Sequence, residues 1–263
     1  MSSTATRDTL PAFIAHRGLS ARAPENTLAA VRAAHAAGCR WVELDVQLLG
    51  DGTPVIWHDA GTRRCSGERR RLSTLDLAGA QRLDVGRWFS EAFAGERMAT
   101  LEAMLELIVD LDLGLNLEFK VNRGRDARAL VERVLPRVER RLDPQRWLAS
   151  SFERTALQAL RRLRPDPERL RLGLLYEKAP RQWAAQAASL SAFSVHVDYR
   201  RLREPLARTI AASPYRLVCY TVNDPLAARR LRDWGAAALI SDDPPRLDRG
   251  QLTRATPSAA LNP

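Results

Sequence analysis

The sequence predicts an α/β fold, a (β/α)8 TIM barrel in a single domain, and two observations favour this architecture. Short apolar runs alternate with amphipathic stretches along the chain, which is the pattern of strands that feed crossover helices in a mainly parallel sheet. The chain has 263 residues, and about eight strands with about as many helices suit one barrel better than two small domains. A doubly wound open sheet is compatible with the same pattern.

Nine runs rich in apolar residues are expected to be strands. They cover residues 12–16, 41–48, 53–58, 114–120, 147–152, 170–175, 193–197, 217–221 and 238–241. Helical patterns are expected over residues 27–37, 125–140, 153–164, 181–189, 203–212 and 225–234. Asn26 is the expected N-cap of the first helix, and Gly38 and Gly235 are expected just past the ends of the first and last helices.

One segment, from about residue 60 to residue 98, interrupts this alternation. It is rich in Arg, Gly and Ser and carries Trp88, Phe89 and Phe93. It is too long and too apolar for a plain loop, so we expect a small inserted subdomain or lid after the third strand segment. We therefore expect one barrel domain over residues 1–248, followed by a flexible tail over residues 249–263 that lacks periodicity.

The composition excludes several classes of protein. With 45% hydrophobic and 27% charged residues, the chain is globular and not disordered. Three cysteines without metal-ligand spacing indicate neither a disulfide framework nor a zinc site, which suits a reducing compartment. Because the sequence has no apolar N-terminal leader and no stretch long enough to span a membrane, we expect a cytoplasmic protein.

The net charge of +10 leaves two interpretations open. Arg and Lys together number 41 against 31 Asp and Glu, and all of the basic residues except Lys120 and Lys178 are arginines. Arginine neutralises phosphates, so the excess is compatible with a nucleic-acid or anionic-membrane partner. The favoured alternative is that most arginines cover solvated helix faces.

The expected strand 41–48 carries acidic side chains on one face. Alternation puts Glu43 and Asp45 on the same side, where two carboxylates need a compensating cation because unpaired buried charge is costly. The expected strand 114–120 presents Glu118 in the same way. These three residues are predicted to form an all-oxygen cluster for one hard divalent cation, Mg²⁺ or Ca²⁺.

Two histidines are expected beside these carboxylates. His16 ends the first expected strand, and strand ends are where catalytic groups collect in a barrel. Asp51-Gly52 is a two-residue hairpin signal, and counting outward from it places His58 opposite Asp45. An unperturbed imidazole pKa of about 6.5 suits both histidines to general acid and base work.

Arg17 and Lys120 are expected to supply positive charge at the same strand ends. Either side chain can hold an anionic phosphate oxygen. A hard metal, two acid-base histidines and two cations are together the components of a phosphoryl-transfer site.

At these residues the chain resembles the glycerophosphodiester phosphodiesterase family, and most closely its small cytoplasmic bacterial enzymes. The family's fold is a TIM barrel with an insertion after its His-Asp motif, which here is His58-Asp59. The matching motifs follow the family's order from residue 13 to about residue 245: His16-Arg17-Gly18, Pro24-Glu25-Asn26-Thr27-Leu28, Glu43-Leu44-Asp45-Val46, Asp51-Gly52, His58-Asp59, Thr100-Leu101-Glu102, Asn116-Leu117-Glu118-Phe119-Lys120, Ser150-Ser151-Phe152, Tyr220-Thr221-Val222-Asn223 and Ile240-Ser241-Asp242.

The resemblance implies hydrolysis of glycerophosphodiesters, such as glycerophosphocholine or glycerophosphoethanolamine, to sn-glycerol 3-phosphate and an alcohol. His16 and His58 would be the base and the acid, in an order that the sequence leaves open. The glycerol 2-hydroxyl would attack first and form a cyclic phosphate, which water then opens. Phe152 and Tyr220 would form an apolar wall for the glycerol carbons, and Glu25 would have a structural role.

Two rival functions differ from this expectation in their partners. A phosphatidylinositol-type phospholipase C shares the barrel and the paired histidines but needs a membrane-docking rim, for which the sequence has no interfacial segment. An arginine-rich nucleic-acid-binding barrel would need a basic platform interleaved with aromatic residues, which is also missing. We therefore expect a small-molecule substrate, no nucleic acid and no stable membrane association, while the oligomeric state stays open.

Overall fold

The computed structural model describes residues 10–247, which contain a closed barrel of eight parallel strands. In the order in which they pair around the ring, the strands are β1 (Phe13–His16), β2 (Trp41–Leu48), β4 (Gly114–Phe119), β5 (Trp147–Ser151), β6 (Leu172–Tyr176), β7 (Ser194–Asp198), β8 (Arg216–Tyr220) and β9 (Ala238–Ser241). β1 pairs with both β2 and β9, which closes the ring and excludes the open sheet. The expected barrel is confirmed, and the expected tail at residues 249–263 lies outside the described part of the chain.

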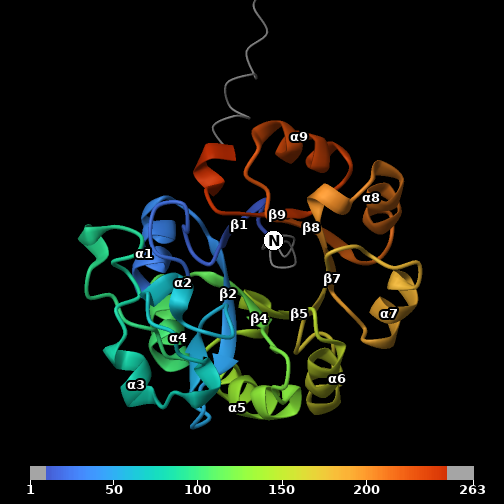
Figure 1. Cartoon of the computed structure of the whole chain (residues 1–263). Helices are drawn as coiled ribbons and strands as arrows, with labels where there is room; N and C mark the ends of the chain where they lie inside the picture. Colours follow the sequence, from blue (N-terminus) through green and yellow to red (C-terminus); the bar gives the residue numbers. More distant parts are fainter. Residues whose placement is uncertain (1–9, 248–263) are drawn as a thin grey trace, which may run out of the picture.

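Helices surround the barrel on its outer side (Figure 1). They are α1 (Leu28–Ala36), α4 (Leu101–Asp110), α5 (Ala127–Glu139), α6 (Arg154–Leu163), α7 (Trp183–Ser189), α8 (Glu204–Ala211) and α9 (Pro225–Asp233). No helix was predicted at α4, although four buried residues repeat there at helical spacing: Leu101, Met104, Leu105 and Ile108. Within residues 10–247, no helix is long and apolar enough to cross a bilayer.

The start of α1 differs from the expected one by one residue. Thr27, and not Asn26, is the N-cap, because its hydroxyl accepts a hydrogen bond from the backbone N–H of Ala30 at 3.1 Å. Asn26 adopts a left-handed backbone conformation with φ of 58° and turns its side chain toward the barrel. The expected helix ends are confirmed, since Gly38 and Gly235 both follow their helices with positive φ.

The hairpin after β2 has a different register from the expected one. β3 (Pro54–Ile56) runs antiparallel to β2 with Leu48 opposite Pro54, and the N–H of Leu49 donates to the carbonyl of Thr53 at 2.9 Å. The turn therefore has three residues, Gly50 to Gly52, with Gly52 at φ of 83°. This extra residue shifts the pairing so that Trp57, and not His58, donates to the carbonyl of Asp45. The expected pairing of Asp45 with His58 is wrong.

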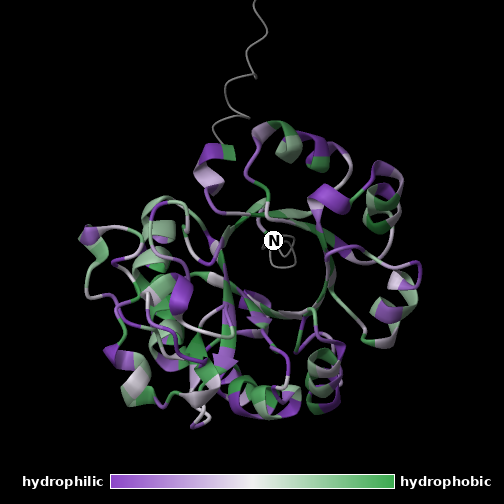
Figure 2. Ribbon diagram, in the orientation of Figure 1, coloured by the Kyte–Doolittle hydropathy of each residue, from purple (hydrophilic) through white to green (hydrophobic). Residues whose placement is uncertain are grey.

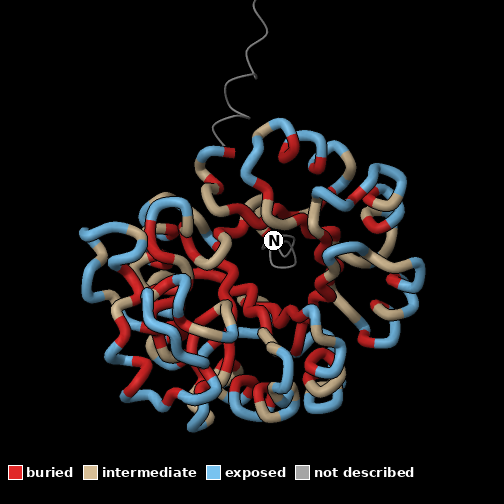
Figure 3. The backbone as a smooth tube through the Cα atoms, viewed as in Figure 1, coloured by how far each residue is buried: buried red, intermediate tan, exposed pale blue. Residues whose placement is uncertain are grey.

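Apolar side chains fill two layers around the strands. One cluster contains Ile14, Trp41, Leu148 and Ile240, which pack together. A larger layer joins the outer strand faces to the helices, whose apolar sides turn inward (Figure 2). The strands are buried while the outer helix faces are exposed (Figure 3). Each fully buried leucine in these layers stabilises the fold by about 1.5–3 kcal/mol.

The segment from residue 60 to residue 98, which we call the insertion, lies on the β2 side of the ring (Figure 1). It contains α2 (Arg63–Ser66), η1 (Leu72–Thr74), α3 (Leu77–Arg82) and η2 (Glu91–Phe93). Phe89 stacks edge-on against both Trp88 and Phe93. A separate small core anchors the segment to the hairpin and consists of Leu49, Val55, Trp57, Cys65, Leu72, Leu75, Ala80, Leu83, Val85 and Met98.

Candidate active site

Three carboxylates meet inside the mouth of the barrel. Glu43 and Asp45 lie on the inner face of β2, and Glu118 lies beside Asp45 on β4 because the two strands pair in that register. All three are buried, and each offers an oxygen within 4.8 Å of the others. The cluster predicted from strand alternation is therefore assembled.

Two cations face this cluster. The Nζ atom of Lys120 lies 2.6 Å from Glu118 and 3.2 Å from Asp45. The Nε atom of Arg17 lies 3.4 Å from Asp45, and the backbone N–H of Arg17 donates to Glu43 at 3.2 Å. Among residues 10–247, two cations thus lie beside three buried carboxylates, so that full ionisation of the cluster would leave one negative charge over.

The pKa values of the cluster follow from this imbalance. Burial raises the pKa of Glu118 to about 7, and the neighbouring charge of Asp45 adds to this effect. Burial together with repulsion from Asp45 and Glu118 raises the pKa of Glu43 well above its ordinary value. Burial also opposes ionisation of Asp45, but Lys120 and Arg17 outweigh it and lower the pKa of that group. A divalent cation at this position would supply the missing positive charge.

The donor set fits a hard divalent cation. All three donors are carboxylate oxygens, they converge from two adjacent strands, and neither cysteine nor histidine is among the three. Mg²⁺ and Ca²⁺ both take such ligands and complete their coordination shells with further oxygens. The residues present therefore fit the expected cofactor class without distinguishing the two ions.

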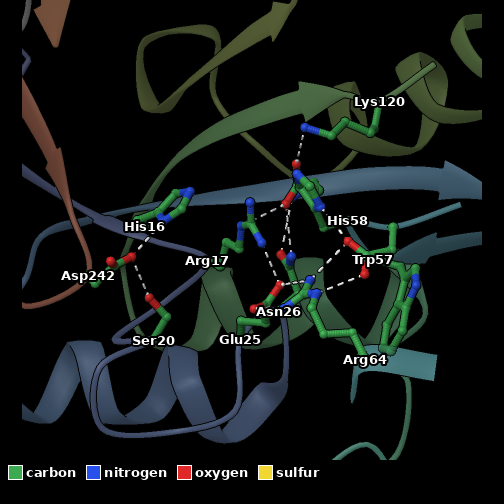
Figure 4. Close-up of polar contacts among 12 residues, drawn as sticks. His16, Arg17, Ser20, Glu25, Asn26, Trp57, His58, Arg64, Lys120 and Asp242 are labelled. Carbon is green, nitrogen blue, oxygen red and sulfur yellow. Dashed lines mark hydrogen bonds and ion pairs between the residues drawn. The ribbon is translucent and has the colours of Figure 1, made fainter. Parts of the chain in front are cut away.

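His16 stands at the barrel mouth at the end of β1. Its Nδ1 atom lies 2.6 Å from a carboxylate oxygen of Asp242, which follows β9, and its Nε2 atom lies 3.9 Å from Glu43. Asp242 also accepts hydrogen bonds from Ser20 and Asn223. The ring is thus fixed through Nδ1 by Asp242 (Figure 4), and Nε2 is the ring nitrogen nearer to Glu43.

His58 reaches the same mouth although it lies beyond the end of β3. The side-chain amide of Gln47 donates to the carbonyls of Trp57, His58 and Asp59, which fixes this segment over β2. The Nδ1 atom of His58 lies 2.7 Å from Asp59. Burial lowers the pKa of His58 despite the nearby charge of Asp45, which favours the neutral imidazole.

An ion-pair network joins the insertion to the first barrel loop. Arg64 of α2 donates to both oxygens of Asp59 and to both oxygens of Glu25. Glu25 also accepts from Arg17 at 2.6 Å. The side-chain amide of Asn26 donates to Asp45 at 2.9 Å (Figure 4). Glu25 therefore contacts arginines and not the carboxylate cluster.

Aromatic rings line the mouth beside Lys120. Phe152 follows β5 and Tyr220 ends β8, and their ring centroids lie 5.9 Å apart in an edge-on arrangement. The ammonium group of Lys120 lies 5.6 Å from the centre of the Phe152 ring. The phenol of Tyr220 donates to the carbonyl of Tyr176, which holds its ring in place. The two residues expected to form a wall are therefore adjacent.

The sequence alone does not predict the roles that four polar residues have in the site. Asp242 and Asp59 hold the histidine rings, while Asn26 and Arg64 hold the residues around them. Asp59 and Asp242 belong to two of the family's motifs, but the motifs do not show which side chains these carboxylates contact. Arg64 had no sequence signal, because it is one of several arginines in a loop-rich segment. His196 is buried within the barrel against Ser194, in agreement with a structural role.

Comparisons with known proteins agree with this arrangement. A model of the glycerophosphoryl diester phosphodiesterase family matches residues 16–246. A glycerophosphodiester phosphodiesterase of Caldanaerobacter subterraneus is 32% identical over 234 residues, which cover 89% of this chain and 95% of that protein. A glycerophosphodiester phosphodiesterase of Bacillus subtilis is 25% identical over 88% of this chain and 83% of its own length.

A solved structure extends the comparison to three dimensions. A phosphodiesterase of Oleispira antarctica, in complex with the product sn-glycerol-3-phosphate, has a TM-score of 0.87 against this chain at 31% sequence identity. The match covers 92% of this chain and 97% of that one.

Proposed function

The chain belongs to the glycerophosphoryl diester phosphodiesterase family and is an enzyme of that class, and from this premise we propose how its residues act. The substrate is a glycerophosphodiester, such as glycerophosphocholine or glycerophosphoethanolamine, which is cleaved to sn-glycerol 3-phosphate and an alcohol. The barrel and its insertion act as one catalytic domain in the cytoplasm, without nucleic acid or a stable membrane attachment. One observation carries the proposal: two histidines, each backed by a carboxylate, flank a buried cluster of three carboxylates.

Glu43, Asp45 and Glu118 would hold one divalent cation, Mg²⁺ or Ca²⁺. Such a cation, when bound, supplies Lewis-acid chemistry that draws charge from phosphate oxygens and lowers the pKa of an adjacent hydroxyl. Asn26 supports the cluster because its amide donates to Asp45 and so fixes the direction of that carboxylate. The cluster lies on two rigid strands, which keeps its three oxygens together before substrate arrives.

His16 and His58 move the protons of the reaction. One Nε2 atom accepts the proton of the attacking glycerol 2-hydroxyl, and the other donates a proton to the oxygen of the leaving alcohol. In the second step their roles reverse, because water must lose a proton when it opens the cyclic phosphate. Asp242 and Asp59 orient the rings and stabilise the positive charge that each imidazole gains.

Arg17 and Lys120 provide the remaining positive charge. They are close enough to the cluster to stabilise the negative charge that develops on the phosphate during displacement. Phe152 and Tyr220 form the apolar wall against which the glycerol carbons pack. The wall also excludes water from one side of the site, which strengthens the charge interactions beside it.

The test is release of sn-glycerol 3-phosphate from purified glycerophosphodiesters. We expect activity that EDTA abolishes and that Mg²⁺ or Ca²⁺ restores, and loss of activity in Glu43→Gln with retained folding by circular dichroism. Glu132→Gln, at an exposed ion pair on α5, is the matched control and should keep full activity. Cleavage of intact phospholipid in liposomes, or activity that survives EDTA, would contradict the proposal.

A further inference from the structure

An open cavity beside the active site is lined mainly by arginines. It has a volume of about 850 Å³, and Asp59 and Arg64 form the wall nearest to His58. The other charged residues that line it are Arg63, Arg69, Arg70 and Arg71. We call it the arginine cavity. Its lining contains one carboxylate, that of Asp59, against five guanidinium groups.

Most of the charge in the arginine cavity is not neutralised by the protein. Arg64 is the exception, because its guanidinium is bound by Glu25 and Asp59. Within residues 10–247, the guanidinium groups of Arg63, Arg69, Arg70 and Arg71 have no acidic partner. Guanidinium groups bind phosphate with two parallel hydrogen bonds, so four free ones at one cavity favour a phosphate ligand.

Residues 61–71 carry the arginines of the cavity, and backbone contacts hold this segment in a defined shape. Gly61 and Arg71 pair as an isolated antiparallel bridge, and the N–H of Thr62 donates to the carbonyl of Arg70 at 3.1 Å. The hydroxyl of Thr62 donates to the carbonyl of Glu68 at 2.7 Å. Leu72, directly after Arg71, is buried in the small core that anchors the insertion to the hairpin. The arginine side chains are exposed, but the backbone that carries them is fixed.

The basic lining continues toward the catalytic lysine. A second cavity of about 380 Å³ shares Gly61 and Arg71 with the arginine cavity and adds Arg123 and Arg125. A third cavity of about 310 Å³ shares Arg125 with the second and reaches Lys120. Positive side chains therefore line adjoining hollows from the active site to the insertion.

We propose that the arginine cavity binds an additional phosphate carried by the headgroup of the substrate. The inference rests on the proposed function and adds to it a preference for glycerophosphodiesters whose leaving alcohol is itself phosphorylated. It also orders the two histidines. A headgroup held in this cavity lies on the His58 side, so His58 donates its Nε2 proton to the leaving oxygen as the bond from phosphorus to that oxygen breaks. His16 accepts the proton of the 2-hydroxyl whose oxygen forms the new bond to phosphorus.

The test compares two diesters that differ by one phosphate, glycerophosphoinositol and glycerophosphoinositol 4-phosphate. At low ionic strength we expect the phosphorylated diester to have a kcat/KM higher by about fivefold or more, through a lower KM, and we expect salt to reduce the difference. In the triple variant Arg69→Gln/Arg70→Gln/Arg71→Gln the preference should disappear, while hydrolysis of glycerophosphoinositol stays within about twofold.

The matched control removes three exposed arginines that have no acidic partner among residues 10–247, two from the α5–β5 loop and one from α6, as Arg140→Gln/Arg141→Gln/Arg162→Gln. It changes the net charge equally and should keep the preference. Equal kcat/KM values for the two diesters in the unmodified enzyme, or a preference that survives in the Arg69–Arg71 variant, would overturn the inference and leave the proposed function intact.

Two further outcomes are separable. If neither inositol diester nor glycerophosphocholine is hydrolysed, the proposed function fails, and calorimetric titration with inositol 1,4-bisphosphate decides the site. Binding that the Arg69–Arg71 variant loses supports the site, and no binding overturns it. If the diesters are not distinguished but the variant loses binding to phosphatidylglycerol vesicles or to DNA, the arginines serve a macromolecular surface and the inference is wrong.

Discussion

The two histidines of the site are held by different parts of the molecule. His16 is fixed by the barrel alone: it ends β1, and its partner Asp242 follows the adjacent strand β9. His58 is fixed by the insertion and its hairpin, where its partner is the next residue in the chain, Asp59, and Arg64 holds that partner from α2. We call these the barrel arm and the insertion arm.

The contrast shows two routes to the same local geometry. In both arms a carboxylate contacts Nδ1 and so orients the ring, which is the arrangement that a proton-transferring imidazole needs. The barrel arm obtains it from the register of neighbouring strands. The insertion arm lacks that support beyond the end of β3, and Gln47, Arg64 and Glu25 replace it with side-chain contacts.

Removal of either imidazole should have the largest effect. We expect His16→Ala and His58→Ala each to lower kcat on the order of 10³-fold, because in the proposed mechanism each arm supplies one of the two proton transfers. His35→Ala, on the exposed side of α1, is the control and should be silent. Steady-state kinetics on glycerophosphocholine measure the effect. A variant of one arm that keeps full activity would show that only the other arm is catalytic.

Removal of the supporting carboxylates should have the next largest effect. We expect Asp242→Asn and Asp59→Asn each to lower kcat on the order of 10²-fold with little change in KM, because the ring loses its orientation and its counter-charge. Asp243→Asn is the control, since that neighbouring carboxylate pairs with Arg22 at the surface. A loss confined to Asp242→Asn would mean that the insertion arm is not held through Asp59.

Arg64 sharpens the comparison because only the insertion arm has such a residue. We expect Arg64→Gln to lower kcat on the order of 10-fold, because the guanidinium of Arg64 donates four hydrogen bonds to Asp59 and Glu25. Arg64→Lys should lose less activity, because a lysine ammonium can donate some of these hydrogen bonds. Arg63→Gln, one residue earlier in α2, should change kcat little.

Double variants test which arm Arg64 serves. Arg64→Gln should lower kcat little further when Asp59→Asn is already present, because the two residues act on the same imidazole. When Asp242→Asn is present instead, the two losses of kcat should multiply, because the residues act on different imidazoles. Independent effects of Arg64 and Asp59 would contradict the role of Arg64 as a positioning residue of the insertion arm.

The smallest expected effect concerns stability in acid. Burial opposes ionisation of both supporting carboxylates, yet hydrogen bonds from His16 hold the pKa of Asp242 at about 2, and hydrogen bonds from Arg64 and His58 hold the pKa of Asp59 at about 2. An unfolded aspartate titrates near about 3.9. Each group therefore stabilises the fold above about pH 4, and this stabilisation is lost as the pH falls toward about 2.

Urea unfolding between pH 6 and pH 2.5 measures this effect. Both carboxylates are partly exposed, so we expect no more than about 1 kcal/mol from each. Asp242→Asn and Asp59→Asn should both flatten the decline of the unfolding free energy in acid. Curves that stay parallel to that of the unmodified protein would exclude a stabilising role for the charges.

Much of the fold and of the site could be predicted because both follow from strand alternation. Alternation placed Glu43, Asp45 and Glu118 on inner faces, and glycines after helical patterns marked two helix ends correctly. The hairpin register failed because Asp51-Gly52 suits both a two-residue turn and the last two positions of a three-residue turn. One residue decides between them, and it changes every pairing beyond the turn.

The supporting residues could not be predicted, for reasons of distance and number. Asp242 is 226 residues away from His16 in the chain, and only closure of the barrel brings them together. Arg64 is one of five arginines in the span from Arg63 to Arg71, and nothing local distinguishes the one that reaches Glu25. Thr27 replaced Asn26 as the N-cap because the Asn26 side chain is used by Asp45 instead.

The separation of His16 and Asp242 has a consequence for the order in which the protein matures during synthesis. The residues of the insertion arm all lie between Glu25 and Arg64, so they leave the ribosome early and can meet in a short nascent chain. His16 leaves earlier still but has no partner until β9 and Asp242 have been made and have closed the ring. Since strands so distant in sequence pair late, we expect a growing chain to form the pair of His58 with Asp59 early and to gain the pair of His16 with Asp242 only when the barrel is complete.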